Sequence, residues 1–133
     1  MPRLPRFLHV LTAVHSLGAL ACFAMALGSA VSTPFREGLA VTGGSTIMVR
    51  WFGAGTWAFL SFIGAVLGVL AYASWRRRPW AWPLTLVLYG IGVLGALWQV
   101  SVGIPQGWAA AAVNASVFAY AATPAVRRAY LGR

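Results

Sequence analysis

Acidic side chains are almost absent from this chain of 133 residues, in which Glu37 is the single acid. Lysine is missing as well, because all ten basic residues are arginines, and the formal net charge is +9. Paired carboxylates, a Ser-His-Asp set and a lysine-containing phosphate loop are therefore lacking, and the common hydrolytic mechanisms have no residues to use. No apolar segment contains a carboxylate that could carry a proton across a membrane. We expect a protein that is not an enzyme and not a proton-coupled antiporter.

Cysteine and histidine are also scarce. Cys22 is the single cysteine, which excludes an intrachain disulfide, a CxxC redox pair and a cysteine-based metal cluster. His9 and His15 are the only histidines, and on a helix their side chains differ in direction by roughly 240°. They cannot clamp one metal ion or flank one haem, so we expect no metal site.

The arginines lie in short groups between long uncharged runs. No charged residue occurs within residues 7–35, 51–75 or 79–126. A nucleic-acid-binding protein needs its basic groups together on a water-facing surface, whereas arginines that flank apolar runs are typical of membrane proteins. With 60% hydrophobic and 8% charged residues, the chain is predicted to lie in a lipid bilayer, without a nucleic-acid partner.

Four apolar runs are long enough to cross a bilayer as helices. A hydrocarbon core of roughly 30 Å needs about 20 apolar residues at a rise of about 1.5 Å each. Unpaired backbone groups are costly in hydrocarbon, so these runs must be helical. We predict one all-α membrane domain over residues 1–133, with transmembrane helices at about 7–31, 52–74, 80–102 and 106–123.

The distribution of arginines predicts the orientation, because short cytoplasmic loops carry an excess of positive charge. With the N-terminus inside, eight arginines are cytoplasmic and two, Arg36 and Arg50, are outside. We predict an up-down-up-down four-helix bundle in the cytoplasmic (inner) membrane, with both termini cytoplasmic. The pair Thr123-Pro124 favours a further short helix over about 125–131 on the inner surface, where its arginines would meet lipid phosphates.

The longest predicted loop, residues 32–51, contains Gly43-Gly44, a pair that suits a tight hairpin turn. A short two-stranded β-hairpin on the outer side of the membrane is therefore one structure open to this loop. Such a hairpin is marginally stable in water on its own, so it would need the helix ends or a partner to hold it.

His15 and Asn114 are polar residues that the prediction places near the middle of the bilayer. Polar groups at that depth must find partners, and a hydrogen bond between these two residues, worth about 1 kcal/mol, is the simplest expectation. Alternatively, His15 and Asn114, with Tyr89 or Gln99, line a small pocket for a quinone, a lipid head group or a haem-like pigment. We expect no catalytic residue.

Small residues recur at spacings that allow helices to approach closely. Such faces favour packing, either within the chain or between copies. The candidate positions are Gly64 and Gly68; Gly92 and Ala96; Ala111, Ala115 and Ala119; and, on the first helix, His15, Gly18, Cys22 and Ser29.

The second half of the chain resembles a known type of protein. Its features are the turn Trp75-Arg76-Arg77-Arg78-Pro79-Trp80, Asn114 in the fourth helix, and the ending Thr123-Pro124-Ala125-Val126-Arg127-Arg128. In these features the chain is similar to small uncharacterised bacterial integral membrane proteins with four helices. The resemblance implies that fold and no mechanism. Some such families have an acidic residue late in the third helix, where this chain has Gln99.

These observations favour a small non-catalytic membrane protein that acts through packing. It would be an accessory or assembly subunit of a larger membrane complex, or a homo-oligomeric bundle. The first alternative is a binder of a small hydrophobic ligand or pigment at His15 and Asn114. The second is a small-solute channel or transporter, which would need a polar stripe along a span. We expect no resident cofactor. The expected partners are the lipid bilayer and either other membrane subunits or further copies of the chain.

Overall fold

The computed structural model of the chain describes residues 6–42 and 46–132, and the side chains of 9–39 and 49–132. All regular elements in these ranges are helical, which confirms the predicted all-α class for the described residues. They are α1 (Arg6–Val31), α2 (Thr33–Thr42), α3 (Thr46–Phe52), the 3-10 turn η1 (Gly53–Gly55), α4 (Thr56–Trp75), α5 (Ala81–Ser101), α6 (Gly107–Ala122) and α7 (Pro124–Leu131).

Three helical segments are long and apolar enough to cross a membrane. They are His9–Val31, Val49–Trp75 and Ala81–Ser101. α6 has 16 residues and a length of roughly 24 Å, less than the roughly 30 Å of a hydrocarbon core. It passes the same test only together with α7, from which it is separated by a bend of 59°. Within residues 6–42 and 46–132 there are therefore three membrane-length helices, or four if the bent pair is counted as one span.

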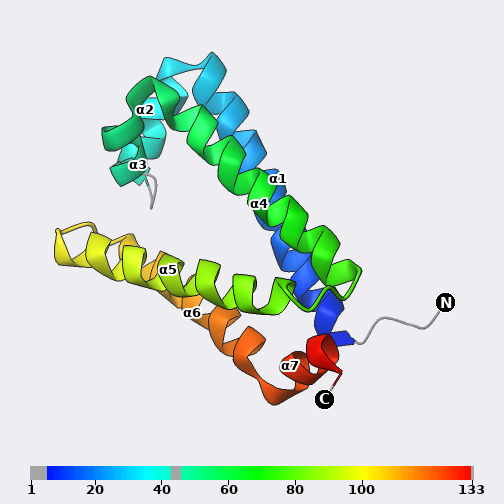
Figure 1. Cartoon of the computed structure of the whole chain (residues 1–133). Helices are drawn as coiled ribbons and strands as arrows, with labels where there is room; N and C mark the ends of the chain where they lie inside the picture. The colour runs from blue at the N-terminus through cyan, green and yellow to red at the C-terminus, as the bar shows by residue number, and fades with distance from the viewer. Residues whose placement is uncertain (1–5, 43–45, 133) are drawn as a thin grey trace.

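The helices form two antiparallel hairpins that diverge from one end of the molecule (Figure 1). α1 packs along α4, and α5 packs along α6. By contrast, α4 and α5 make few contacts beyond the sharp turn that joins them at residues 76–80. The arrangement is thus a pair of hairpins joined at one end, whereas we predicted that the four helices pack as one bundle.

Small residues explain the close packing of α1 on α4. A Cβ atom added to Gly64 would lie 3.3 Å from Cβ of Cys22, and one added to Gly18 would lie 3.1 Å from Cδ1 of Leu67. Larger side chains at these positions would push the helices apart. Gly68 differs, since an added Cβ would meet no described atom within 4 Å. Of the predicted pair, Gly64 faces α1 and Gly68 does not.

α5 and α6 also approach each other at glycines. A Cβ atom on Gly107, the first residue of α6, would lie 2.6 Å from the carbonyl oxygen of Ala96. Gly92 of α5 packs directly under the side-chain amide of Asn114. Gly103 has a φ of 85° and closes the turn between the two helices, a backbone conformation that favours glycine.

The two hairpins meet at the end of the molecule that holds α7. The Tyr130 hydroxyl donates a hydrogen bond of 2.7 Å to Oγ of Ser74 in α4. Within the α5–α6 hairpin at the same end, Nε1 of Trp82 donates to the carbonyl oxygen of Ala121 at 2.9 Å. The main buried apolar cluster surrounds these bonds and comprises Leu11, Leu70, Ala73, Ala81, Ala121, Val126 and Tyr130. The helix predicted near 125–131 is therefore present as α7, and it joins both hairpins.

The connection between α1 and α4 contradicts the β-hairpin that the glycine pair suggested. α2 and α3 occupy both sides of the predicted turn, while Gly43 and Gly44 themselves lie outside the described residues. Ser32 provides a helix start, because its Oγ accepts a hydrogen bond of 3.2 Å from the backbone N–H of Phe35. Helices satisfy their backbone groups internally, whereas an isolated hairpin leaves both outer edges unpaired.

Candidate functional site

His15 lies at the contact between the two hairpins. None of its surface is exposed, and its ring stacks on Tyr89 of α5, with centroids 5.8 Å apart and an interplanar angle of 27°. Both residues lie in the half of their helix that is nearer to α7. This ring pair therefore links α1 to α5 in the half of each helix that is nearer to α7.

Three polar atoms at this contact are buried without a hydrogen-bond partner among the described residues. They are Nδ1 and Nε2 of His15 and Oγ1 of Thr12. Leaving one buried polar group unpaired costs about 1–3 kcal/mol. Because residues three apart lie on the same side of a helix, Thr12 and His15 form one polar spot on α1. It could hydrogen-bond a carbonyl, hydroxyl or head group supplied from outside the described chain.

Asn114 does not belong to this spot, and the predicted His15–Asn114 hydrogen bond is wrong. Nδ2 of Asn114 donates to the carbonyl oxygen of Ala110 in its own helix at 2.8 Å, and the amide covers Gly92 of α5. The prediction matched the two residues by depth alone. It failed because α6 pairs with α5, so that Asn114 is directed into the α5–α6 contact.

Of the two other residues predicted to line a pocket with His15, one lies at His15 and the other does not. Tyr89 is brought to His15, whereas Gln99 lies beside Gly107, where its Cβ would be 3.1 Å from an added Cβ. Sequence reasoning missed Thr12, although its spacing of three residues from His15 was a usable signal. His9 is exposed while His15 is buried, and no group of three or more metal-ligating side chains occurs in the part of the chain that the structure describes.

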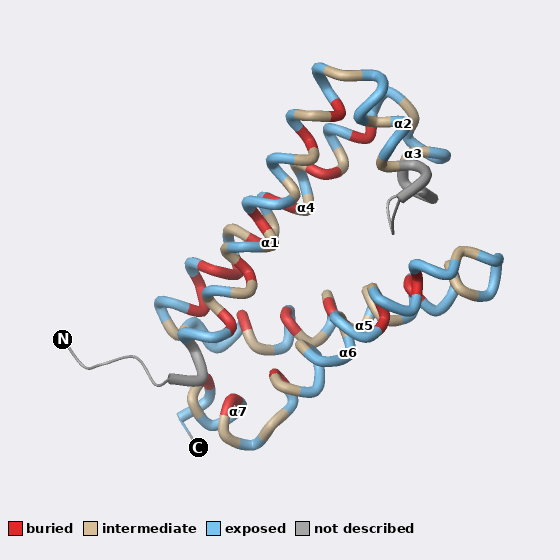
Figure 2. Tube along the Cα trace, turned by 180° about the vertical axis from the view of Figure 1, so that it is seen from behind, coloured by how far each residue is buried: buried red, intermediate tan, exposed pale blue. Residues whose placement is uncertain are grey.

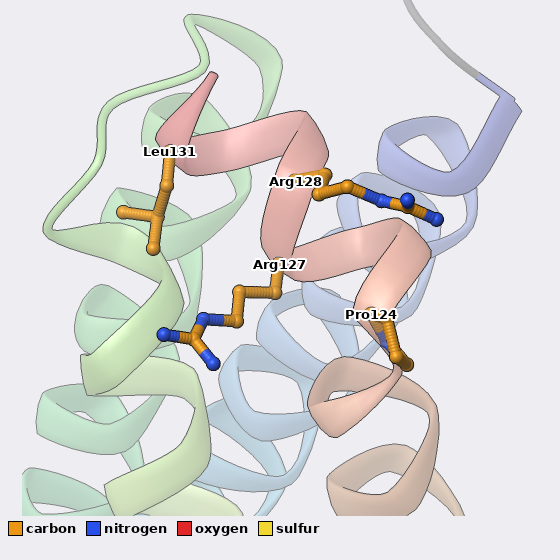
Figure 3. A pocket seen from close by; sticks show the side chains of 4 residues that line it. All are labelled: Pro124, Arg127, Arg128 and Leu131. Carbon is orange, nitrogen blue, oxygen red and sulfur yellow. The ribbon is translucent and has the colours of Figure 1, made fainter. Parts of the chain in front are cut away.

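Two surface grooves lie near the joined end of the hairpins. One, of about 470 Å³, runs along α7 and is lined by Pro124, Arg127, Arg128 and Leu131 (Figure 3). The other, of about 190 Å³, is apolar and lies between α1 and α6, with the described lining Val10, Leu11, Val14, Ser116, Val117 and Tyr120. The second groove shows that α1 and α6 face each other across the angle between the hairpins.

The chemistry available at the hairpin junction is limited. An imidazole, a hydroxyl and a phenol can donate or accept hydrogen bonds and contact an aromatic ring, but no carboxylate lies among them. One ring face of His15 is covered by Tyr89 and none of its surface is exposed, so a ligand would reach the imidazole only if the neighbouring helices moved apart. Comparisons of the chain with protein-family models, with curated proteins and with solved structures gave no match. The resemblance to small bacterial four-helix membrane proteins therefore stays a prediction.

Proposed function

We propose that this chain is a non-catalytic integral membrane protein that acts through helix packing. It would serve as an accessory or assembly subunit of a larger membrane complex, or assemble with copies of itself. The observation that carries the proposal is the divergence of two tightly packed hairpins that are joined at one end only (Figure 2). Two hairpins of this kind leave faces that must be covered by lipid or by other helices.

The exposed faces include both large and small side chains. Large apolar residues with more than three-fifths of their surface exposed occur on α1, α4, α5 and α6, as lipid contact requires; examples are Leu17, Phe62, Ile91, Leu94 and Val113.

α6 also exposes the small residues Ala112, Ala115, Ser116 and Ala119. Small residues give little favourable lipid contact but allow another helix to approach closely. This exposed alanine face of α6 favours a helical partner.

The proposed orientation has both termini in the cytoplasm and four crossings of the inner membrane, with α6 and α7 as the bent fourth segment. It is supported by charge. Arg127, Arg128 and the arginines of the 76–78 turn lie at the joined end, whereas Arg36 and Arg50 lie at the opposite end (Figure 1). Short cytoplasmic segments are the ones enriched in arginine, so the joined end would face the cytoplasm.

The proposal is tested on the full chain, extracted from membranes in mild detergent and weighed by native mass spectrometry. We expect a defined complex with other subunits or with further copies. Ala115→Leu together with Ala119→Leu should dissociate it, because the added side chains fill the exposed face of α6. Ala65→Leu is the matched control, since Ala65 is an exposed alanine on α4. A single chain in the wild type, or an assembly unchanged by the double variant, would refute the proposal.

A second candidate is the binding of a small hydrophobic ligand, such as a quinone or a pigment, between the hairpins. It is favoured by one observation: the buried nitrogens of His15, and the hydroxyl of Thr12 one helical turn earlier, have no hydrogen-bond partner in the part of the chain that the structure describes. The purified protein would then carry a stoichiometric extractable ligand that is lost in His15→Ala and kept in His9→Ala. Absence of such a ligand from the wild type would remove this candidate.

A further inference from the structure

α7 presents its two faces to different surroundings. Val126 and Tyr130 are buried against the hairpins, with at most 4% of their surface exposed. Pro124, Arg127, Arg128 and Leu131 follow one another at the spacing of a single helix face, and together they line the groove of about 470 Å³ (Figure 3). The buried face holds the helix in place, so the arginine face is set on a fixed support.

The charge of this face is not balanced within the molecule. Glu37, the only acidic side chain of the sequence, lies on α2 at the opposite end (Figure 1). The exposed Arg76 and Arg78 lie in the turn between α4 and α5, at the same end as α7, and add to the positive potential. The guanidinium of Arg127 lies 5.7 Å from the ring centroid of Trp82, a contact that positions the cation without neutralising it.

The surroundings of the groove favour one kind of anion. Figure 3 shows the guanidinium groups of Arg127 and Arg128 extending to opposite sides of α7, so that each is available to phosphate oxygens on its own side, which arginine binds through two parallel hydrogen bonds. Pro124 and Leu131, at the two ends of the groove, add apolar carbon that suits the glycerol and upper acyl chain of a lipid. α7 follows the 16-residue helix α6 across a bend of 59°, and the proposed membrane orientation sets it at head-group depth.

We propose that α7 is a binding site for anionic phospholipid head groups, with the guanidinium groups of Arg127 and Arg128 on lipid phosphates at opposite sides of the helix and Leu131 against an acyl chain. The inference rests on the membrane location in the proposed function, but not on partner assembly. A chain that remains monomeric and still selects anionic lipid would refute the packing function and leave this site standing.

The test uses the full chain in mild detergent, titrated with phosphatidylglycerol, with phosphatidylcholine and with inorganic phosphate, and bound molecules are counted by native mass spectrometry. We expect the wild type to retain phosphatidylglycerol in preference to phosphatidylcholine. Arg127→Gln combined with Arg128→Gln should weaken phosphatidylglycerol binding about 30-fold, from the usual contribution of two basic residues near an anionic surface. Arg50→Gln, an exposed arginine at the other end of the chain, is the matched control and should bind as the wild type does.

Three outcomes would overturn the proposal. They are equal retention of the two lipids by the wild type, unchanged phosphatidylglycerol binding in the double glutamine variant, and displacement of the lipid by millimolar inorganic phosphate, which would indicate a site for free phosphate. Arg127→Lys with Arg128→Lys guards against a folding defect in the glutamine variant. It keeps both charges and should keep the preference for phosphatidylglycerol; loss of that preference in a folded lysine variant would also overturn the proposal.

Discussion

Gly107 is the position where one added methyl group is expected to do the most damage to the α5–α6 hairpin. A Cβ atom there would lie 2.6 Å from the carbonyl oxygen of Ala96, 2.8 Å from Cγ2 of Val100 and 3.1 Å from Cβ of Gln99. The nearest of these atoms belongs to the backbone of α5, which cannot rotate away as a flexible side chain can. Relief therefore requires the start of α6 to move outward.

The size of the effect follows from two opposing terms. Overpacking a well-packed contact costs about 1–3 kcal/mol. The gain in helix propensity from glycine to alanine is at most about 1 kcal/mol, and less at the first position of a helix, where few backbone hydrogen bonds depend on it. We therefore expect Gly107→Ala to destabilise the protein by roughly 1–2 kcal/mol, the difference between these two terms.

The assay is reversible unfolding in mixed micelles, followed by circular dichroism as a denaturing detergent is added. Gly95→Ala is the control, because Gly95 lies on the same hairpin and an added Cβ would meet no described atom within 4 Å. We expect this control to be neutral or slightly stabilising. A Gly107→Ala protein as stable as the wild type would refute the close approach of α6 to the backbone of α5.

Two further predictions concern the backbone and the buried polar spot. Arg77 lies just after α4 and has a φ of 52°. Its N–H donates to the carbonyl oxygen of Ser74, and the N–H of Arg78 donates to that of Ala73, which is a Schellman-type cap. The Arg77→Gly protein should therefore be about 1 kcal/mol more stable than the Arg77→Ala protein, which keeps the left-handed strain. Equal stability of the two variants in the same unfolding assay would count against that cap. His15→Leu removes two buried nitrogens that have no hydrogen-bond partner among the described residues, and it should raise stability by about 1 kcal/mol in lipid-free detergent. A clear loss of stability would mean that the imidazole has a partner in the purified protein.

The helices were predictable because their signals are local. Each predicted apolar segment lies within about one helical turn of an observed helix, since length and freedom from charge decide where a chain can be buried in hydrocarbon. The helix α7 was predictable from Thr123 and Pro124 for the same reason. The loop was the exception, because a glycine pair fits a turn between strands as readily as a break between α2 and α3.

The candidate site was predictable only in part. Burial of His15 follows from its position in an apolar run, and its spacing from Thr12 can be read directly. Its pairing with Tyr89 instead of Asn114 could not be predicted, because depth along a helix says nothing about which neighbouring helix a side chain faces. That choice depended on the packing of Gly92 under the Asn114 amide, a contact between residues 22 positions apart.

By itself, the sequence determined that the long apolar segments are helical, how long they are and where the charges stand, since each of these follows from the cost of placing polar backbone and ionised groups in hydrocarbon. The tertiary structure alone decided that α1 pairs with α4 and α5 with α6, that the two hairpins diverge, and that α7 closes their common end with its arginines outward. Those features depend on contacts between distant small residues, where tenths of an ångström decide which helices can approach.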